Sequence, residues 1–133
     1  MKIDLHTHTT ASDGTLSPVE LIDRALERGI THLAITDHDT IDGLLGLNEA
    51  PEKKYSSLKI IPGIELTANI LNRSYHILGL WVDINNISFL EFLKNQKNIR
   101  EERAIKIGDI LDNDGIKNAF EGAKKIAANS VVG

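Results

Sequence analysis

The chain has 133 residues, of which 41% are hydrophobic and 26% are charged, and its formal net charge is −4 at pH 7. This length allows one domain with a substantial core, and the acidic balance excludes a basic field that would attract nucleic acid or membranes non-specifically. The absence of cysteine excludes thiolate metal sites, disulfides and cysteine nucleophiles. No apolar run reaches membrane-spanning length, and Met1-Lys2 shows no signal-peptide pattern, so we expect a cytoplasmic protein without a membrane partner.

The first half of the chain predicts a strand–helix–strand unit. Residues 2–8 are the expected first strand. The next helix should start at Ser17-Pro18-Val19-Glu20, where Ser caps, Pro occupies the first turn and Glu follows three residues after the cap. Gly29 should end this helix. The apolar run in Ile30–Thr36 indicates a parallel strand covered on both faces, which makes a right-handed βαβ unit the expected topology.

After this unit, the predicted helices and strands no longer follow a regular alternation. Asp39 or Thr40 could cap a short helix that runs through Leu44, Leu45 and Leu47. The remaining expected elements, in order, are a loop at 50–57, a third strand at Leu58–Ile61 that resumes at Ile64–Leu66, a turn at 69–74, a fourth strand at Tyr75–Val82, a helix from Ile87 to 112–115, and a last helix from Asn118 to about Ala128.

Two histidines one residue apart stand near the start of the chain. On a strand, His6 and His8 share one face with Asp4. Two neighbouring imidazoles can bind one divalent cation, because neutral ring nitrogens suit zinc, manganese and iron. The pair alone is a weak signal. Ser12-Asp13-Gly14 then forms a turn that presents a further carboxylate just beyond the strand.

Further histidines and acids follow or begin the other predicted strands. His38 follows the second strand, Glu65 lies in the third, and His76 is near the start of the fourth. Because the carboxyl ends of parallel strands meet at one edge, we expect these side chains to gather with His6 and His8. Glu65 could bridge two cations, while Asp13 and His38 could hold a separate one. Clusters of two or three cations polarise phosphoryl groups and deprotonate water near neutral pH.

Several nearby polar residues have simpler explanations. His32, at the opposite end of the second strand, is expected to be structural. Asp4 is expected to orient a histidine rather than to bind a metal. Asp37 and Asp39 could cap the following turn, and we expect Asp37 to support the ligands from behind them.

The pattern resembles the polymerase and histidinol phosphatase (PHP) family. Asp4–His8 with Ser12-Asp13-Gly14 resembles its first motif, Thr36-Asp37-His38 its second, and Gly63-Ile64-Glu65-Leu66 its third. The stretch Tyr75–Gly79, followed by Arg100 and Arg103-Ala104, is similar to a subgroup of stand-alone phosphoesterases. The resemblance implies an α/β fold, here an incomplete (β/α)7 barrel with about four N-terminal strands. Residues 1–86 would be the N-terminal half of that barrel, and residues 87–133 part of a helical insertion.

The resemblance also implies the site. The implied ligands of two or three manganese, zinc or iron ions are His6, His8, Asp13, His38, Glu65 and His76. Arg100 and Arg103 could bind substrate, although arginines on a charged helix face are usually only solvated. Family members are longer and supply a further His and an Asp-x-His. The chain is therefore expected to end before the rest of the barrel, and to be inactive alone and prone to self-association.

The expected activity is metal-dependent hydrolysis of a phosphate monoester by activated water. The expected substrate is a nucleotide, such as a 3′,5′-nucleoside bisphosphate or an AMP-like molecule, or an RNA 5′ end, and not duplex DNA. Two alternatives stay open: a histidinol-phosphate-type phosphatase, and a non-catalytic metal-binding or interaction module.

Overall fold

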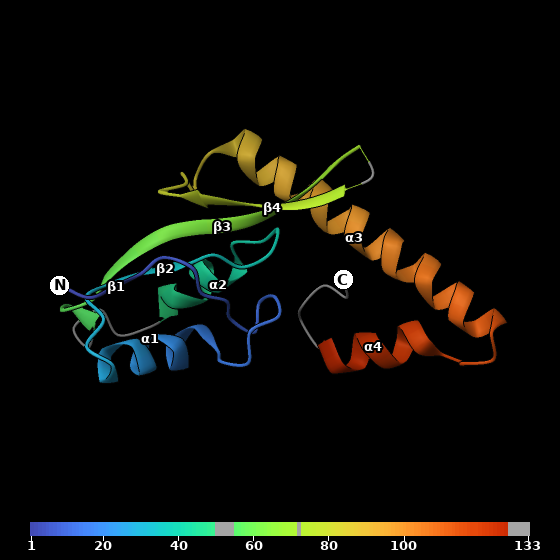
Figure 1. Ribbon diagram of the computed structural model, residues 1–133, viewed down its shortest axis with the longest axis horizontal. Coiled ribbons are helices and arrows are strands. Elements are labelled where there is room, and N and C mark those ends of the chain that lie inside the picture. Colours follow the sequence, from blue (N-terminus) through green and yellow to red (C-terminus); the bar gives the residue numbers. More distant parts are fainter. Residues whose placement is uncertain (50–54, 72, 128–133) are drawn as a thin grey trace. The chain divides into compact units, whose positions relative to one another are not determined.

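The computed structural model describes residues 1–49, 55–71 and 73–127 of the chain. They fall into two compact units, Met1–Asn86 and Ile87–Gly133 (Figure 1). Within the described residues, no helix has the length and apolar character needed to cross a membrane.

The first unit is built on a four-stranded sheet. Its strands are β1 (Ile3–Asp4), β2 (His32–Ile35), β3 (Lys59–Ile70) and β4 (Arg73–Leu80), and they lie in the order β1-β2-β3-β4. The first three strands are parallel, whereas β3 and β4 form an antiparallel hairpin. The α/β fold with four N-terminal strands is confirmed.

Helix α1 (Pro18–Glu27) connects β1 to β2 and begins as the sequence predicts (Figure 1). The Ser17 hydroxyl accepts the N–H of Glu20, and the Glu20 carboxylate accepts the backbone N–H of Ser17 at 2.8 Å. This reciprocal capping satisfies two N–H groups that the helix itself cannot pair. After the helix, Gly29 adopts φ 69°, a left-handed conformation that suits glycine.

The substitution Ser17→Ala should lower the free energy of unfolding by about 1 kcal/mol, because it removes the hydroxyl that accepts the N–H of Glu20. Urea denaturation of the 133-residue chain measures the change. Ser57→Ala is the matched control, since Ser57 is an exposed serine outside any helix. Equal unfolding curves for the two variants would show that the cap does not contribute.

The core of this unit lies between α1 and the sheet. Ile22 and Ala25 of α1 pack with Leu33 of β2 and with Tyr55 and Leu58 before β3. The whole apolar run of β2 after His32 is buried, as expected for a parallel strand covered on both faces. This packing fixes the ends of β2 and β3, which carry the polar cluster described below.

Two local predictions were wrong. The third strand does not break at Pro62-Gly63, because β3 runs continuously through both residues. A Cβ on Gly63 would lie 2.6 Å from Thr36 Cγ2, so this glycine serves close packing against the end of β2 rather than a turn. Helix α2 (Asp42–Leu45) has Ile41 at its cap position without a side-chain cap, and the Thr40 hydroxyl instead accepts the N–H of Asp42.

The other predicted elements agree in type and order with the structure, although their ends differ. The turn predicted at 69–74 is too long, because β3 runs to Ile70 and β4 begins at Arg73 and ends at Leu80. A 3-10 helix at Gly46–Glu49 extends α2, and the predicted loop at 50–57 lies partly outside the described residues. The first strand is shorter than predicted, because only Ile3–Asp4 pairs as a strand.

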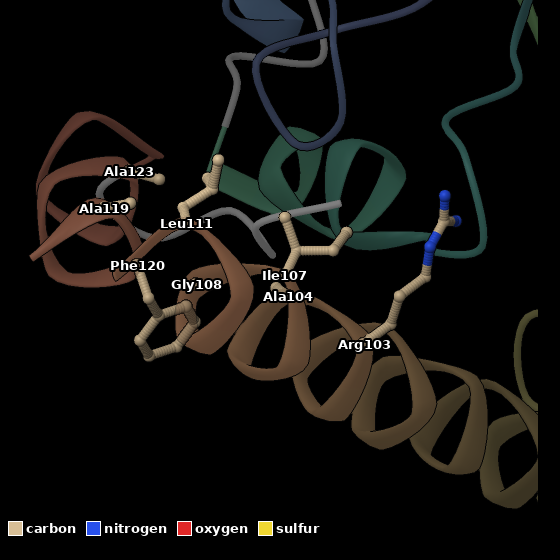
Figure 2. A pocket seen from close by; sticks show the side chains of 8 residues that line it. All are labelled: Arg103, Ala104, Ile107, Gly108, Leu111, Ala119, Phe120 and Ala123. Atoms are coloured by element: carbon tan, nitrogen blue, oxygen red, sulfur yellow. The ribbon is translucent and has the colours of Figure 1, made fainter. Parts of the chain in front are cut away.

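The second unit is a helix pair, α3 (Ile87–Asn113) and α4 (Ala119–Ala127). The two helices approach closely at Gly108, where a Cβ would lie 2.6 Å from the Cβ of Phe120 (Figure 2). Beside this contact is a pocket of about 130 Å³, lined mainly by small and apolar side chains, with Arg103 among its lining residues (Figure 2). Glycine at position 108 therefore lets α4 lie against α3.

Candidate metal centre

Hydrogen bonds between two threonines bring residues 5–8 to the end of β2. The N–H of Thr36 donates to the carbonyl of Thr7 at 2.8 Å, and the N–H of Thr7 donates to the Thr36 hydroxyl at 3.1 Å. The side chain of Thr36 thus takes the place of a backbone partner, so the chain stays beside β2 after regular pairing ends. His6 and His8, on either side of Thr7, are held near the carboxyl ends of the parallel strands.

His38 and Glu65 lie side by side in the same region. They form an isolated parallel bridge beyond the end of β2. The N–H of Glu65 donates to the carbonyl of Asp37 at 3.1 Å, and the N–H of Asp39 donates to the carbonyl of Glu65 at 3.0 Å. These backbone hydrogen bonds therefore fix the position from which the Glu65 side chain extends.

Four imidazoles surround the Glu65 carboxylate, whose residue is 6% exposed. His6 Nε2 lies 2.8 Å and His8 Nε2 3.1 Å from Glu65 Oε2, so both histidines point to one oxygen as the alternation of a strand predicts. His38 Nε2 lies 3.7 Å from the same oxygen. His76, which comes from β4, places its Nδ1 3.1 Å from the other oxygen, Oε1.

Asp13 adds a second carboxylate on the exposed side of the cluster. Its Oδ1 lies 3.2 Å from His8 Nδ1, and its Oδ2 lies 3.7 Å from His38 Nε2. The turn that carries Asp13 folds tightly over the preceding segment. A Cβ on Gly14 would lie 2.4 Å from the carbonyl oxygen of His8, so only glycine allows this approach.

The six residues form three overlapping groups whose donor atoms lie within 4.8 Å of one another. The groups are His6–His8–Glu65, His8–Asp13–His38 and His38–Glu65–His76. The Nδ1 atoms of His8 and His38 are buried and, within the described part of the chain, form no hydrogen bond of good geometry, although Asp13 Oδ1 lies 3.2 Å from His8 Nδ1. Buried polar atoms are normally paired. The imidazole nitrogens that converge on the shared carboxylates fit a divalent metal of the manganese, iron or zinc type.

The electrostatics of the cluster favour the metal-binding forms of Glu65 and His38. Burial would raise the pKa of Glu65, but the hydrogen bond with His6 and the nearby imidazoles outweigh burial and lower that pKa below 4.5. Burial lowers the pKa of His38 below 6.5, and the carboxylates of Glu65 and Asp13 offset this only in part. Near neutral pH the carboxylate is ionised and the His38 imidazole is neutral.

The metal-free chain should lose stability on acidification from pH 7. Since the pKa of His38 is lower in the folded state, the unfolded chain takes up a proton first as pH falls below 6.5. The lowered pKa of Glu65 acts in the same direction below pH 4.5. Urea denaturation with a chelator, at pH 7, 5.5 and 4, measures the free energy of unfolding. His38→Gln should reduce the loss between pH 7 and 5.5, and an unchanged loss in this variant would contradict the assignment.

His32 and Asp4 have hydrogen-bond partners other than the rings of the clustered histidines. His32 Nδ1 lies 3.0 Å from the neighbouring Thr31 hydroxyl, in a local contact. Asp4 is exposed, and its carboxylate accepts a long 3.5 Å hydrogen bond from the backbone N–H of His6 rather than from a ring. Its expected role in orienting a histidine stays a prediction. Arg100 and Arg103 lie on α3 in the second unit, and substrate binding by them also stays a prediction.

The hydrogen bonds of Thr9, Ser12 and Thr36 were not predicted from the sequence. The Thr36 hydroxyl pairs with the backbone of Thr7, and both Thr9 and Ser12 donate to the Asp37 carboxylate. The local sequence does not indicate these hydrogen bonds, because the partners lie 25 to 29 residues away in the chain.

Two curated relatives of this chain are named for the hydrolysis of phosphate esters. The chain is 45% identical over 131 residues to a 5′-3′ exoribonuclease of Haemophilus influenzae, covering 98% of the chain and 47% of that protein. It is 36% identical over 127 residues to a 3′,5′-nucleoside bisphosphate phosphatase of Chromobacterium violaceum, covering 96% of the chain and 44% of that protein. The chain thus spans about half the length of these curated relatives.

A solved structure agrees with these sequence matches. The structure of an amidohydrolase from Chromobacterium violaceum, with bound sulfate and no metal, matches with a TM-score of 0.81 at 36% identity. The match covers 94% of this chain and 43% of that one. Residues 4–127 match the PHP domain. With most of its length covered by that domain, the chain belongs to the PHP domain family.

Proposed function

We propose that the chain forms the N-terminal part of a metal-dependent phosphoesterase that hydrolyses a phosphate monoester. The observation that carries the proposal is the convergence of four imidazoles on the two oxygens of Glu65, with Asp13 beside them. Two or three divalent ions, of manganese, zinc or iron, would supply charge neutralisation for the phosphoryl oxygens and acidify the attacking water. We also propose that the protein is cytoplasmic, as expected from the sequence.

Each side chain has a defined task in this proposal. His6 and His8 would hold one ion together with Glu65, and His76 would bind on the other Glu65 oxygen, so the carboxylate offsets positive charge on both sides. Asp13 and His38 would hold a further ion. The side chains of Asp13, His6 and His76 are 69%, 52% and 50% exposed, which leaves the cluster open to a phosphate that arrives from solvent.

The proposed substrate is a nucleotide with a terminal phosphate, either a 3′,5′-nucleoside bisphosphate or the 5′ end of RNA. The names of the relatives from Haemophilus influenzae and Chromobacterium violaceum support this class.

A domain exchange tests the proposal. Residues 1–133 would replace the matching N-terminal part of the Haemophilus influenzae exoribonuclease, of which they cover 47%. We expect the chimera, supplied with Mn²⁺, to release phosphate from a 3′,5′-bisphosphonucleoside. Release of nucleotides from 5′-phosphorylated RNA would show that the same centre also cleaves a phosphodiester. Histidinol phosphate serves as the competing substrate.

Circular dichroism and metal analysis show whether the chimera folds and is loaded. A folded, metal-loaded chimera without turnover on any of these substrates would contradict the phosphoesterase and favour the non-catalytic alternative. Turnover on histidinol phosphate alone would contradict the nucleotide substrate.

A further inference from the structure

We propose that Asp37 is a positioning residue that holds the turn at residues 9–14, and hence Asp13, against His38. The proposal rests on the function proposed above, because it concerns how one of the metal groups is assembled. It assigns no metal contact to Asp37 itself.

The Asp37 carboxylate receives three hydrogen bonds from this turn. Its Oδ1 accepts the N–H of Thr9 at 2.7 Å and the hydroxyl of Ser12 at 2.6 Å, and its Oδ2 accepts the hydroxyl of Thr9 at 2.8 Å. Asp37 is 1% exposed and Thr9 is 0% exposed. Replacing this carboxylate with an apolar side chain would leave three donors without their acceptor, and unpaired buried donors are costly.

Thr9 is hydrogen-bonded to the rest of the turn, so the contacts that hold Thr9 in place also hold the turn. Its carbonyl accepts the N–H groups of Ser12 and Gly14, at 3.1 Å and 2.9 Å, and its hydroxyl accepts the N–H of Ala11 at 3.1 Å. Asp13 lies between two residues that are tied to Thr9 in this way. Asp37 precedes His38 directly, so one buried carboxylate connects the two partners of the Asp13–His38 contact.

Gly43 makes room for this arrangement. A Cβ at position 43 would lie 2.1 Å from Asp37 Oδ2 and 2.7 Å from the Thr9 hydroxyl. The first turn of α2 therefore closes over the Asp37–Thr9 contact, and only glycine fits there. Asp39, on the other side of His38, makes a different connection: its Oδ1 accepts the N–H of Thr67 in β3 at 2.8 Å.

The first test uses the metal-free chain and amide hydrogen exchange. Asp37→Ala should speed exchange of the Ser12 and Gly14 amides by about 10- to 100-fold, the change expected when buried hydrogen bonds are lost. Amides between β2 and β3 should change much less. Gly43→Ala should have the same local effect although the carboxylate remains. Asp39→Asn is the control and should leave the turn unchanged. Unchanged exchange in both test variants, or an equal increase throughout the sheet, would overturn the proposal.

The second test measures Mn²⁺ binding in the same variants by equilibrium dialysis. Asp37→Ala should weaken binding by roughly 10- to 100-fold, the range for residues that support metal ligands. The effect should disappear in an Asp13→Ala background, because Asp37 acts through Asp13, whereas Asp37→Asn should retain most of the affinity. The same loss with and without Asp13 would overturn the positioning role. Failure of the unaltered chain to bind Mn²⁺ would contradict the proposed function instead, and the exchange result would still decide the role of Asp37.

Discussion

Glu65→Gln should weaken Mn²⁺ binding to the 133-residue chain by at least about 100-fold, or roughly 3 kcal/mol. The reason is that this carboxylate is within 3.7 Å of all four site histidines and, like His8 and His38, belongs to two of the three candidate groups. The amide is nearly the same size but carries no negative charge, so the compensation for bound cations is lost. Equilibrium dialysis followed by elemental analysis measures the affinity and the number of ions bound.

The free energy of unfolding of the metal-free chain should change far less than the metal affinity. In that state Glu65 contributes hydrogen bonds to imidazoles, and glutamine keeps part of this bonding capacity. Glu27→Gln, at an exposed position in α1, is the matched control and should leave Mn²⁺ binding intact. In the chimera, Glu65→Gln should abolish phosphate release. Near-normal affinity in Glu65→Gln would mean that the ions bind elsewhere.

The features that the sequence predicts well are those with a local cause. The cap of α1 depends on Ser17 and Glu20, which are three residues apart, and the structure reproduces it. The buried β2 strand follows from its own apolar run. The six candidate ligands were expected from the sequence to gather because parallel strands bring their carboxyl ends to one edge. In the structure Glu65 lies within β3 and His76 within the antiparallel β4, so pairing in the hairpin brings these two together. Their role as metal ligands stays a prediction.

The features that the sequence does not reveal depend on distant partners. Pro62-Gly63 is typical of a turn in isolation, but its close approach to Thr36 keeps it within β3. In the same way, the acid at position 37 could have capped a turn. Only the folded chain shows that its partners are Thr9 and Ser12, 25 to 28 residues earlier. Tertiary contacts therefore overrode local preference at both positions.

The chain by itself should show less than about 1% of the turnover of the chimera, a difference of roughly 3 kcal/mol in barrier height. The family resemblance implies a further His and an Asp-x-His among the ligands, and the sequence has no histidine after His76. At least one ion would then be under-coordinated. Phosphate release from a 3′,5′-bisphosphonucleoside, measured at equal metal loading, provides the comparison. Equal turnover of the chain and the chimera would show that the described residues suffice for catalysis.

The same chain should also self-associate in solution. β1 and β4 are the edges of the described sheet, and unpaired strand edges recruit partners. β4 in addition exposes large side chains, with Tyr75 at 46% and Ile77 at 52%, and such apolar surface favours association. Light scattering should therefore give a mass above that of one 14.7 kDa chain. Ile77→Lys should lower that mass, since a charge on an edge strand opposes pairing. Ile116→Lys, an equally exposed isoleucine in the second unit, should not. A monomer at all concentrations, or equal effects of the two lysines, would contradict association through β4.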